Sequence, residues 1–108
     1  MSWAILYSSR AKTDLKDIYE YIAFDLLVPE IADNIIRKIM KKISTLDAMP
    51  MRHQLRKDEP WHSRGVRYFA VDNYLIHYIP NESMEIVNIL RIVYEGRDIN
   101  QQLSKTTS

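Results

Sequence analysis

The sequence of 108 residues contains no cysteine and only two glycines, and its formal net charge is only +1. Without cysteine it can form no disulfide, thiolate nucleophile or thiolate metal site, which suits a reducing compartment. No apolar run is long enough to span a bilayer, and the first residues lack the basic and apolar regions of a signal peptide. We therefore expect a cytoplasmic protein that does not contact a membrane.

The low net charge also bears on partners. Proteins that bind nucleic acid without sequence preference are usually far more basic, so any such contact here needs a local basic patch. Residues 51–67 are locally basic. This segment is either such a patch or simply a solvated loop. Apolar residues make up 46% of the chain, enough for one modest core, so we expect a single domain over residues 1–108.

The most informative segment runs from residue 63 to residue 100 and predicts three consecutive strands. Apolar side chains alternate in residues 66–71, 74–79 and 86–93, which is the period of a strand. By this alternation Arg91 shares a face with Ile89 and Val93. Asp72-Asn73 supplies a tight hairpin turn, and the cluster at residues 80–83 supplies a second turn.

The first half predicts a strand and two helices. Residues 3–7 form a short strand, and Ser8 or Ser9 then caps a helix with an apolar stripe at Ala11, Leu15, Ile18, Ile22 and Leu26. Pro29 begins a second helix that stops before Pro50, and a short tail helix begins near Asp98. The order β-α-α-β-β-β predicts an α+β fold, with a helical hairpin packed on a mainly antiparallel four-stranded sheet.

Several side chains near the strand ends are of types that bind phosphate, donate protons or anchor a partner. They are Arg67, His77, Tyr78, Arg91, Tyr94 and Arg97, and Trp61 in the preceding loop joins them as an anchor or a plug of the open end of the sheet. Structural roles compete: His77 is more typical of a core histidine, and Arg91 of an ion pair with an acid on a neighbouring helix. Asp14, Asp17 and Glu20 follow helical spacing but indicate a solvated face, and we predict no metal site and no cofactor.

This order of elements resembles the RelE/ParE superfamily of toxins from bacterial type II toxin–antitoxin modules. The resemblance rests on AKTDLKDIYEYI at residues 11–22, on GVR and YLIHY in the strands, and on ILRIVYEGRDI at residues 89–99. It covers about residues 3 to 103 and implies the superfamily fold, a toxin role in the cytoplasm and a cognate antitoxin. It also implies that the pair contacts operator DNA only through the antitoxin.

Members of this superfamily differ in mechanism. RelE-like toxins cut mRNA in the ribosomal A site without a metal, by clamping the scissile phosphate and moving a proton. Arg67 and Arg97 match two of their basic positions, whereas Phe69, Leu75 and Leu103 depart from that pattern. If the chain is a ribonuclease, the resemblance implies Arg67, Arg97, Tyr94 and His77 as its catalytic residues.

ParE-like toxins instead inhibit DNA gyrase, and their pattern fits this chain better. They keep an Arg on the second strand, a Tyr-rich third strand and a His-Gly-x-Arg-Asp ending, in which Tyr94 stands here for the His. The target-binding residues would then be Arg67, Arg91, Tyr78, Arg97 and Trp61. Two alternatives remain open, an mRNA endoribonuclease and a non-toxic module that acts only through its antitoxin.

Apolar residues exceed what a small core readily covers, and exposed apolar patches mark partner sites. We therefore expect an antitoxin in the groove between the helical hairpin and the sheet, bound as an extra strand or an amphipathic helix. The predicted antitoxin-binding residues are Ile31, Ile35, Met49, Met51 and Leu55.

Overall fold

The computed structural model describes residues 2–95. Arg97, Leu103 and the tail helix predicted from Asp98 lie outside the described residues. Along the chain the elements are β1 (Ala4–Tyr7), α1 (Ser9–Glu20), the π-helix η1 (Tyr21–Asp25), α2 (Pro29–Ser44), the 3-10 helices η2 (Thr45–Asp47) and η3 (Pro50–Arg52), β2 (Gln54–Leu55), β3 (Arg67–Val71), β4 (Tyr74–Asn81) and β5 (Ile86–Tyr94).

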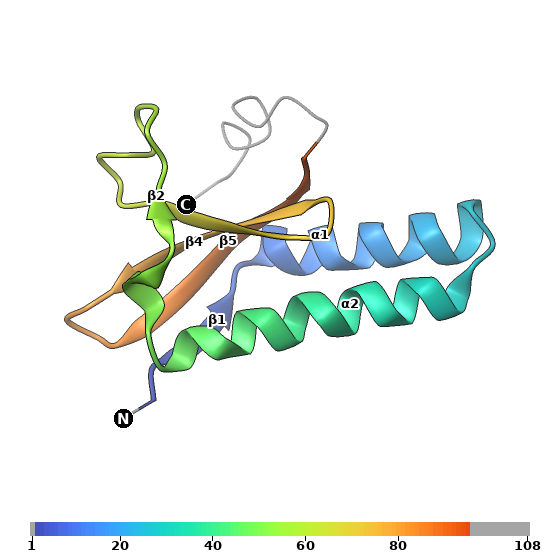
Figure 1. Ribbon diagram of the computed structural model, residues 1–108, viewed down its shortest axis with the longest axis horizontal. Helices are drawn as coiled ribbons and strands as arrows, with labels where there is room; N and C mark the ends of the chain where they lie inside the picture. The colour runs from blue at the N-terminus through green and yellow to red at the C-terminus, as the bar shows by residue number, and fades with distance from the viewer. Residues whose placement is uncertain (1, 96–108) are drawn as a thin grey trace.

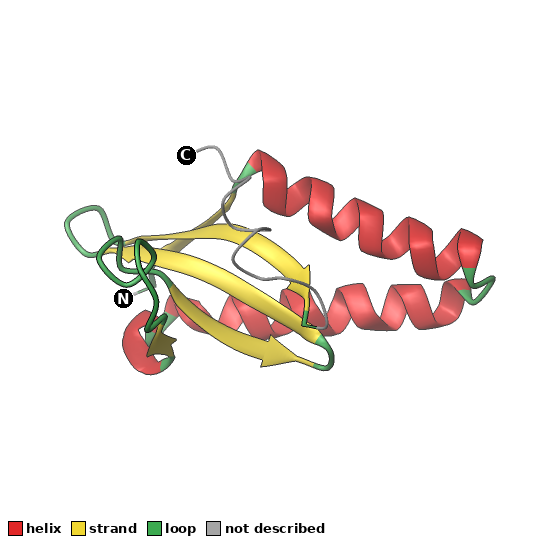
Figure 2. Ribbon diagram, turned by 90° about the horizontal axis from the view of Figure 1, so that it is seen from above, coloured by secondary structure: helices red, strands yellow, loops and turns green. Residues whose placement is uncertain are grey.

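The strands form one mixed sheet in the order β1-β5-β4-β3-β2. β1 is parallel to β5, and the other pairs are antiparallel. The two helices lie side by side against the sheet, and their connected end projects beyond it (Figures 1 and 2). The α+β prediction is confirmed. The strand count differs, because two residues of the expected loop, Gln54 and Leu55, pair with Tyr68 and Arg67 as a fifth strand.

The helix boundaries follow local chemistry. Ser8 is the N-cap of α1, and its hydroxyl accepts a 3.0 Å hydrogen bond from the N–H of Ala11. Pro29 occupies the first turn of α2, where its missing N–H is not needed. Leu26 does not continue the apolar stripe of α1 into the core, because the π-helix η1 rotates the chain and leaves this side chain 52% exposed.

The main core lies between the helices and the sheet. Phe69, Ile76, Tyr78 and Ile92 are buried there beneath Ile39 of α2, and further members are Ala11, Ile43, Leu46, Val71, Val87 and Ile89. The turn between β3 and β4 is the predicted tight one, because Val71 pairs with Tyr74 and Asp72 has a φ of 52°.

A bulge corrects the predicted faces of β5. His77 pairs with Arg91, but the next residue, Tyr78, pairs with Ile89, so Leu90 is skipped. The extra residue shifts the alternation by one. Arg91 therefore does not share a face with Ile89, as the simple period indicated; Ile89 faces the helices, whereas Arg91 stands beside His77 on the opposite face.

Candidate functional site

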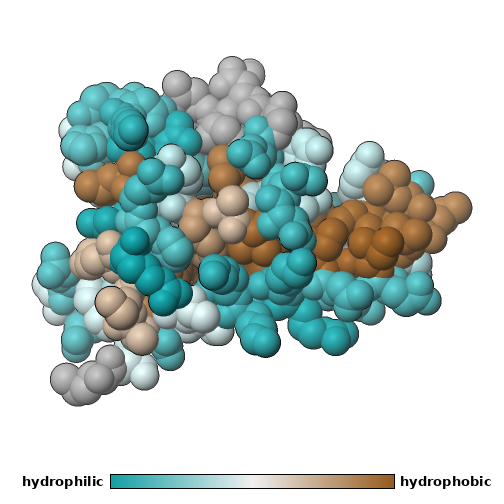
Figure 3. All heavy atoms as spheres, in the orientation of Figure 1, coloured by the Kyte–Doolittle hydropathy of each residue, from teal (hydrophilic) through white to brown (hydrophobic). Residues whose placement is uncertain are grey.

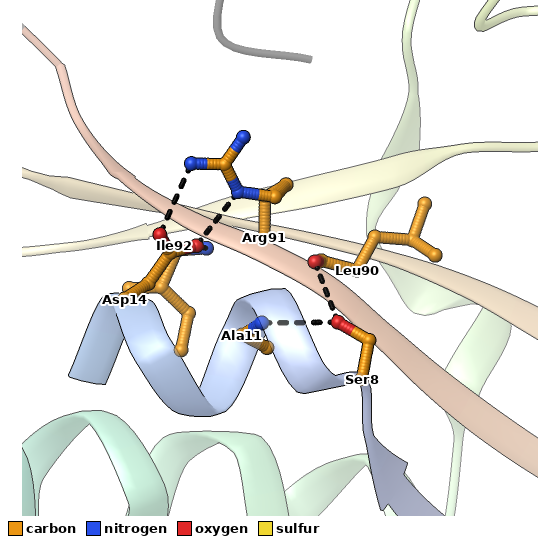
Figure 4. A network of polar contacts seen from close by, with 6 residues as sticks. All are labelled: Ser8, Ala11, Asp14, Leu90, Arg91 and Ile92. Atoms are coloured by element: carbon orange, nitrogen blue, oxygen red, sulfur yellow. Dashed lines mark hydrogen bonds and ion pairs between the residues drawn. The ribbon is translucent and has the colours of Figure 1, made fainter. Parts of the chain in front are cut away.

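Arg91 binds Asp14 of α1 in a buried two-point ion pair. Its Nε donates to Oδ2 of Asp14 at 2.8 Å and its Nη2 to Oδ1 at 3.0 Å, while the N–H of Ile92 donates to Oδ2 at 2.9 Å (Figure 4). Nearby, the hydroxyl of Ser8 donates to the carbonyl of Leu90 at 2.9 Å. Arg91 thus has the helix partner that its position indicated, and it joins α1 to the sheet.

His77 is fully buried on the face of the sheet opposite the main core. Its ring stacks on Tyr68, with 5.8 Å between the ring centroids, and its Nε2 lies 3.5 Å from Nη1 of Arg56. Burial and the charges of Arg56 and Arg91 lower the pKa of His77 to about 3. The imidazole is therefore neutral at physiological pH, and it lacks a proton to donate as imidazolium.

Arg56 is held in turn by Asp58. Two hydrogen bonds of 2.8 Å join its guanidinium to the carboxylate, whose pKa is lowered chiefly by these bonds. The guanidinium also lies over the ring of Tyr68, 5.5 Å from the centroid. The loop before β3 thereby places a paired cation beside His77.

Arg67 and Tyr78 both tie down the segment that follows α2. Nη1 of Arg67 donates to the carbonyls of Met51 at 3.0 Å and His53 at 2.7 Å. The hydroxyl of Tyr78 donates to the carbonyl of Pro50 at 2.6 Å, and burial raises the pKa of this phenol to about 12. Both predicted target-binding residues therefore contact backbone carbonyls of this segment.

Trp61 fills the space under the loop that precedes β3. It is 7% exposed and packs in a small cluster with Val66, Ile79 and Leu90. The guanidinium carbon of Arg64 lies 5.6 Å from its ring centroid. Of the two readings of this residue, plug and exposed anchor, the geometry matches the plug.

Tyr94 lies at the end of β5 and is 45% exposed. Its ring meets Tyr74 edge to face, with 5.8 Å between the centroids. Both tyrosines line a groove of about 590 Å³ between the connected end of the hairpin and the sheet. Its other lining residues are Tyr21, Ile22, Leu26, Val28, Ile31, Ile35, Asp72 and Asn73.

The described members of the predicted ribonuclease set do not gather. Tyr94 pairs with Tyr74, whereas His77 pairs with Arg91 three positions further along β4, so the two side chains project from opposite faces. Arg67 pairs with Tyr78, four positions from Tyr74 and roughly 13 Å along the strand. Arg97, the fourth member, is outside the described residues.

The five residues predicted to bind an antitoxin divide into two groups. Ile31 and Ile35 line the groove, near the start of α2. Met49, which is 61% exposed, Met51 and the partly buried Leu55 follow the other end of that helix. Residues 36–44 of α2 lie between the groups and span roughly 14 Å.

Sequence reasoning missed Asp14 and Arg56. Asp14 was assigned to a solvated face, yet it is 9% exposed. The signal was available, because Asp14 falls three residues after Ala11 and four before Ile18, within the apolar stripe of α1. For Arg56 no pattern indicated a partner, because β2 and the loop after it are not periodic.

Within residues 2–95 no helix is both long and apolar enough to cross a membrane.

Comparison with known proteins agrees with this fold. A chromosomal ParDE toxin–antitoxin system from P. aeruginosa matches with a TM-score of 0.70 and 22% identity, over 86% of this chain and 96% of the other. The RelBE2 toxin–antitoxin complex of Mycobacterium tuberculosis gives 0.60 and 18%, over 87% and 99%. An E. coli RelE mutant in the free state gives 0.65 and 12%, over 97% of both chains.

At such identities these structures establish the fold alone, and no curated protein matches. The family is shown by sequence instead. The model of the ParE toxin of the type II toxin–antitoxin system parDE matches residues 5–99, nearly the whole chain. The protein therefore belongs to the ParE toxin family of type II toxin–antitoxin systems.

Proposed function

We propose that the protein arrests growth by ParE-like inhibition of DNA gyrase and is neutralised by a cognate antitoxin. The observation that carries the choice of mechanism is the placement of Tyr94 and His77 on opposite faces of the sheet. Metal-free RNA cleavage needs a proton carrier and cations around one phosphate. Among residues 2–95, the predicted set meets neither requirement at one place.

Three of the five predicted target-binding residues have structural roles. Arg91 is bound to Asp14, and Tyr78 donates its hydroxyl to Pro50. Trp61 is buried under its loop. We therefore propose that these three residues hold the fold, and that Arg97 contacts the target together with Arg67, whose Nη1 also bonds the carbonyls of Met51 and His53.

An antitoxin partner is supported by the groove and by the relatives. The P. aeruginosa structure belongs to a toxin–antitoxin system, and the M. tuberculosis structure is a toxin–antitoxin complex. The groove beside Ile31 and Ile35 has mostly apolar walls, which suits the apolar face of a partner segment. An antitoxin that also reached Met49 and Met51 would have to run along the whole of α2.

Controlled expression in bacteria tests the proposal. We expect filamentation and an induced DNA-damage response while translation continues at first, because gyrase inhibition acts on DNA. Co-expression of the reading frame adjacent to the toxin gene should restore growth. Primer extension on cellular mRNA should show no A-site cuts; cuts that disappear in Tyr94→Phe would contradict the proposal and favour the ribonuclease.

A further inference from the structure

The connected end of the helical hairpin carries the largest exposed apolar side chains of the hairpin. We call residues 21–31 the hairpin tip. Within it Tyr21 is 54% exposed, Phe24 64%, Leu26 52%, Leu27 76% and Ile31 50%. In the space-filling view, hydrophobic residues gather over the end of the hairpin that projects beyond the sheet (Figure 3). Patches of this kind on a small protein mark a partner site.

The charge around this patch has one sign. Residues 17–36 contain no Lys or Arg but five acids, namely Asp17, Glu20, Asp25, Glu30 and Asp33. The following residues of α2 are basic, at Arg37, Lys38, Lys41 and Lys42. The hairpin is therefore acidic at its tip and basic toward the other end of α2, although the whole chain is nearly neutral.

Three of the acids share a hollow with two aromatic rings. Asp17, Glu20, Tyr21 and Phe24 follow one another at intervals of three, one and three residues, so they lie on one helical face. With Asp25 they line a hollow of about 480 Å³. Carboxylates bind the planar guanidinium group, and aromatic faces attract it, so an arginine side chain is the group that this hollow fits best.

These acids have no ion-pair partner among residues 2–95. Asp25 lies in the last turn of η1, which continues α1, and there the helix dipole disfavours negative charge and no basic residue of that turn offsets it. Asp17 and Glu20 are also three residues apart, a spacing at which like charges repel on a helix.

The backbone of the hairpin tip also indicates a partner site. Residues Tyr21–Asp25 form a π-helix, a distortion that is frequent at functional sites. Leu27 has a φ of 61°, in the left-handed region that a leucine adopts only at a cost in energy. A strained residue whose apolar side chain is 76% exposed contributes little to the core.

We propose that the antitoxin inserts an arginine into the hollow of Asp17, Glu20 and Asp25, and covers Leu26, Leu27 and Ile31 with the apolar residues beside that arginine. This inference rests on the proposed antitoxin. It follows from the chemistry of the tip, whose acids complement a basic partner segment. It is also continuous with the proposed antitoxin groove, because Tyr21, Leu26 and Ile31 line part of that groove.

A charge-reversal experiment tests the inference with purified toxin and the protein encoded by the adjacent reading frame. The variant Glu20→Lys with Asp25→Lys should weaken binding by roughly ten-fold or more at low salt and remove much of its salt dependence. Glu82→Lys with Glu85→Lys is the matched control. It makes the same change in net charge at exposed positions of the turn between β4 and β5, and it should leave the dissociation constant unchanged.

Charge exchange makes the test specific. Each arginine in the antitoxin is changed to Glu in turn, and one of these variants should bind the reversed toxin better than the native antitoxin does. Phe24→Ala should also weaken binding, whereas the equally exposed Met84→Ala should not. Circular dichroism and thermal melts of each variant show whether it is folded.

Each contrary result has its own meaning. If the antitoxin binds the reversed toxin as tightly as the native one, the inference is wrong while the proposed antitoxin stands. If the native toxin does not bind the adjacent protein at all, the proposed function itself fails. If the tip variants abolish self-association in sedimentation velocity but leave antitoxin binding intact, a second copy of the chain covers the tip, and the inference is again wrong.

Discussion

The carboxylate of Asp14 accepts the backbone N–H of Ile92 at the part of the β5 edge that β1 does not cover. β1 pairs with β5 only as far as Ile89, and beyond that point the same carboxylate also binds the guanidinium of Arg91. One side chain of α1 therefore satisfies the strand edge and neutralises a buried cation. The same contacts fix α1, and with it the hairpin, against the sheet.

This pair should dominate the response of the fold to mutation. Asp14→Ala leaves the buried guanidinium of Arg91 without its carboxylate, so we expect a loss of about 3–5 kcal/mol in the free energy of unfolding. Urea denaturation measures this loss. The double variant Asp14→Leu with Arg91→Met should lose less than Asp14→Ala; an equal or greater loss in the double variant would show that the contribution is not that of the ion pair.

His77 should make the protein sensitive to acid. Its pKa falls from 6.5 to about 3 on folding, so the unfolded chain binds a proton that the folded chain excludes. The contribution of His77 to the free energy of unfolding is therefore fully present above pH 6.5. It falls as the pH decreases, by about 1.4 kcal/mol per pH unit down to about pH 3. Denaturation at pH 7, 6 and 5 should show this slope, and His77→Gln should reduce it, whereas the exposed His62→Gln should not. Equal slopes in the native protein and His77→Gln would contradict the assignment.

The hydroxyl of Tyr78 should hold the segment after α2. Tyr78→Phe keeps the ring in the core but leaves the carbonyl of the buried Pro50 without its donor, so we expect a loss of about 1–3 kcal/mol in stability. Tyr21→Phe removes a hydroxyl from an exposed ring and serves as the control, with no measurable change expected. Thermal melts that do not separate the two variants would argue against the Pro50 contact.

Leu27 offers the opposite effect. Leu27→Gly should raise the free energy of unfolding by about 0.5–1 kcal/mol, because glycine adopts a φ of 61° without strain. Leu26→Gly, at a φ of −89°, should lower it. If the inference about the tip is right, Leu27→Gly should bind the antitoxin more weakly even though the free toxin is more stable. If Leu27→Gly is more stable but binds the antitoxin with unchanged affinity, the antitoxin does not cover Leu27.

The sequence predicts the elements of this fold well, because each has a local signal. Ser8 and Pro29 mark helix starts, and Asp72-Asn73 marks a hairpin. The bulge at Leu90 has no local signal, since it depends on how β5 pairs with β4, and it reversed the face assigned to Arg91. The candidate site was harder to predict for the same reason. Its properties come from pairs that are far apart in the sequence, such as Arg91 with Asp14 and His77 with Arg56.

Supercoiling by purified DNA gyrase distinguishes inhibition of this enzyme from cleavage of mRNA. The purified toxin is added to the reaction in increasing amounts, and ribosomes carrying a defined mRNA receive the same preparation in parallel. We expect a dose-dependent loss of supercoiling that the antitoxin reverses, with the ribosome-bound mRNA left intact. Full gyrase activity together with discrete cuts in the mRNA would contradict it.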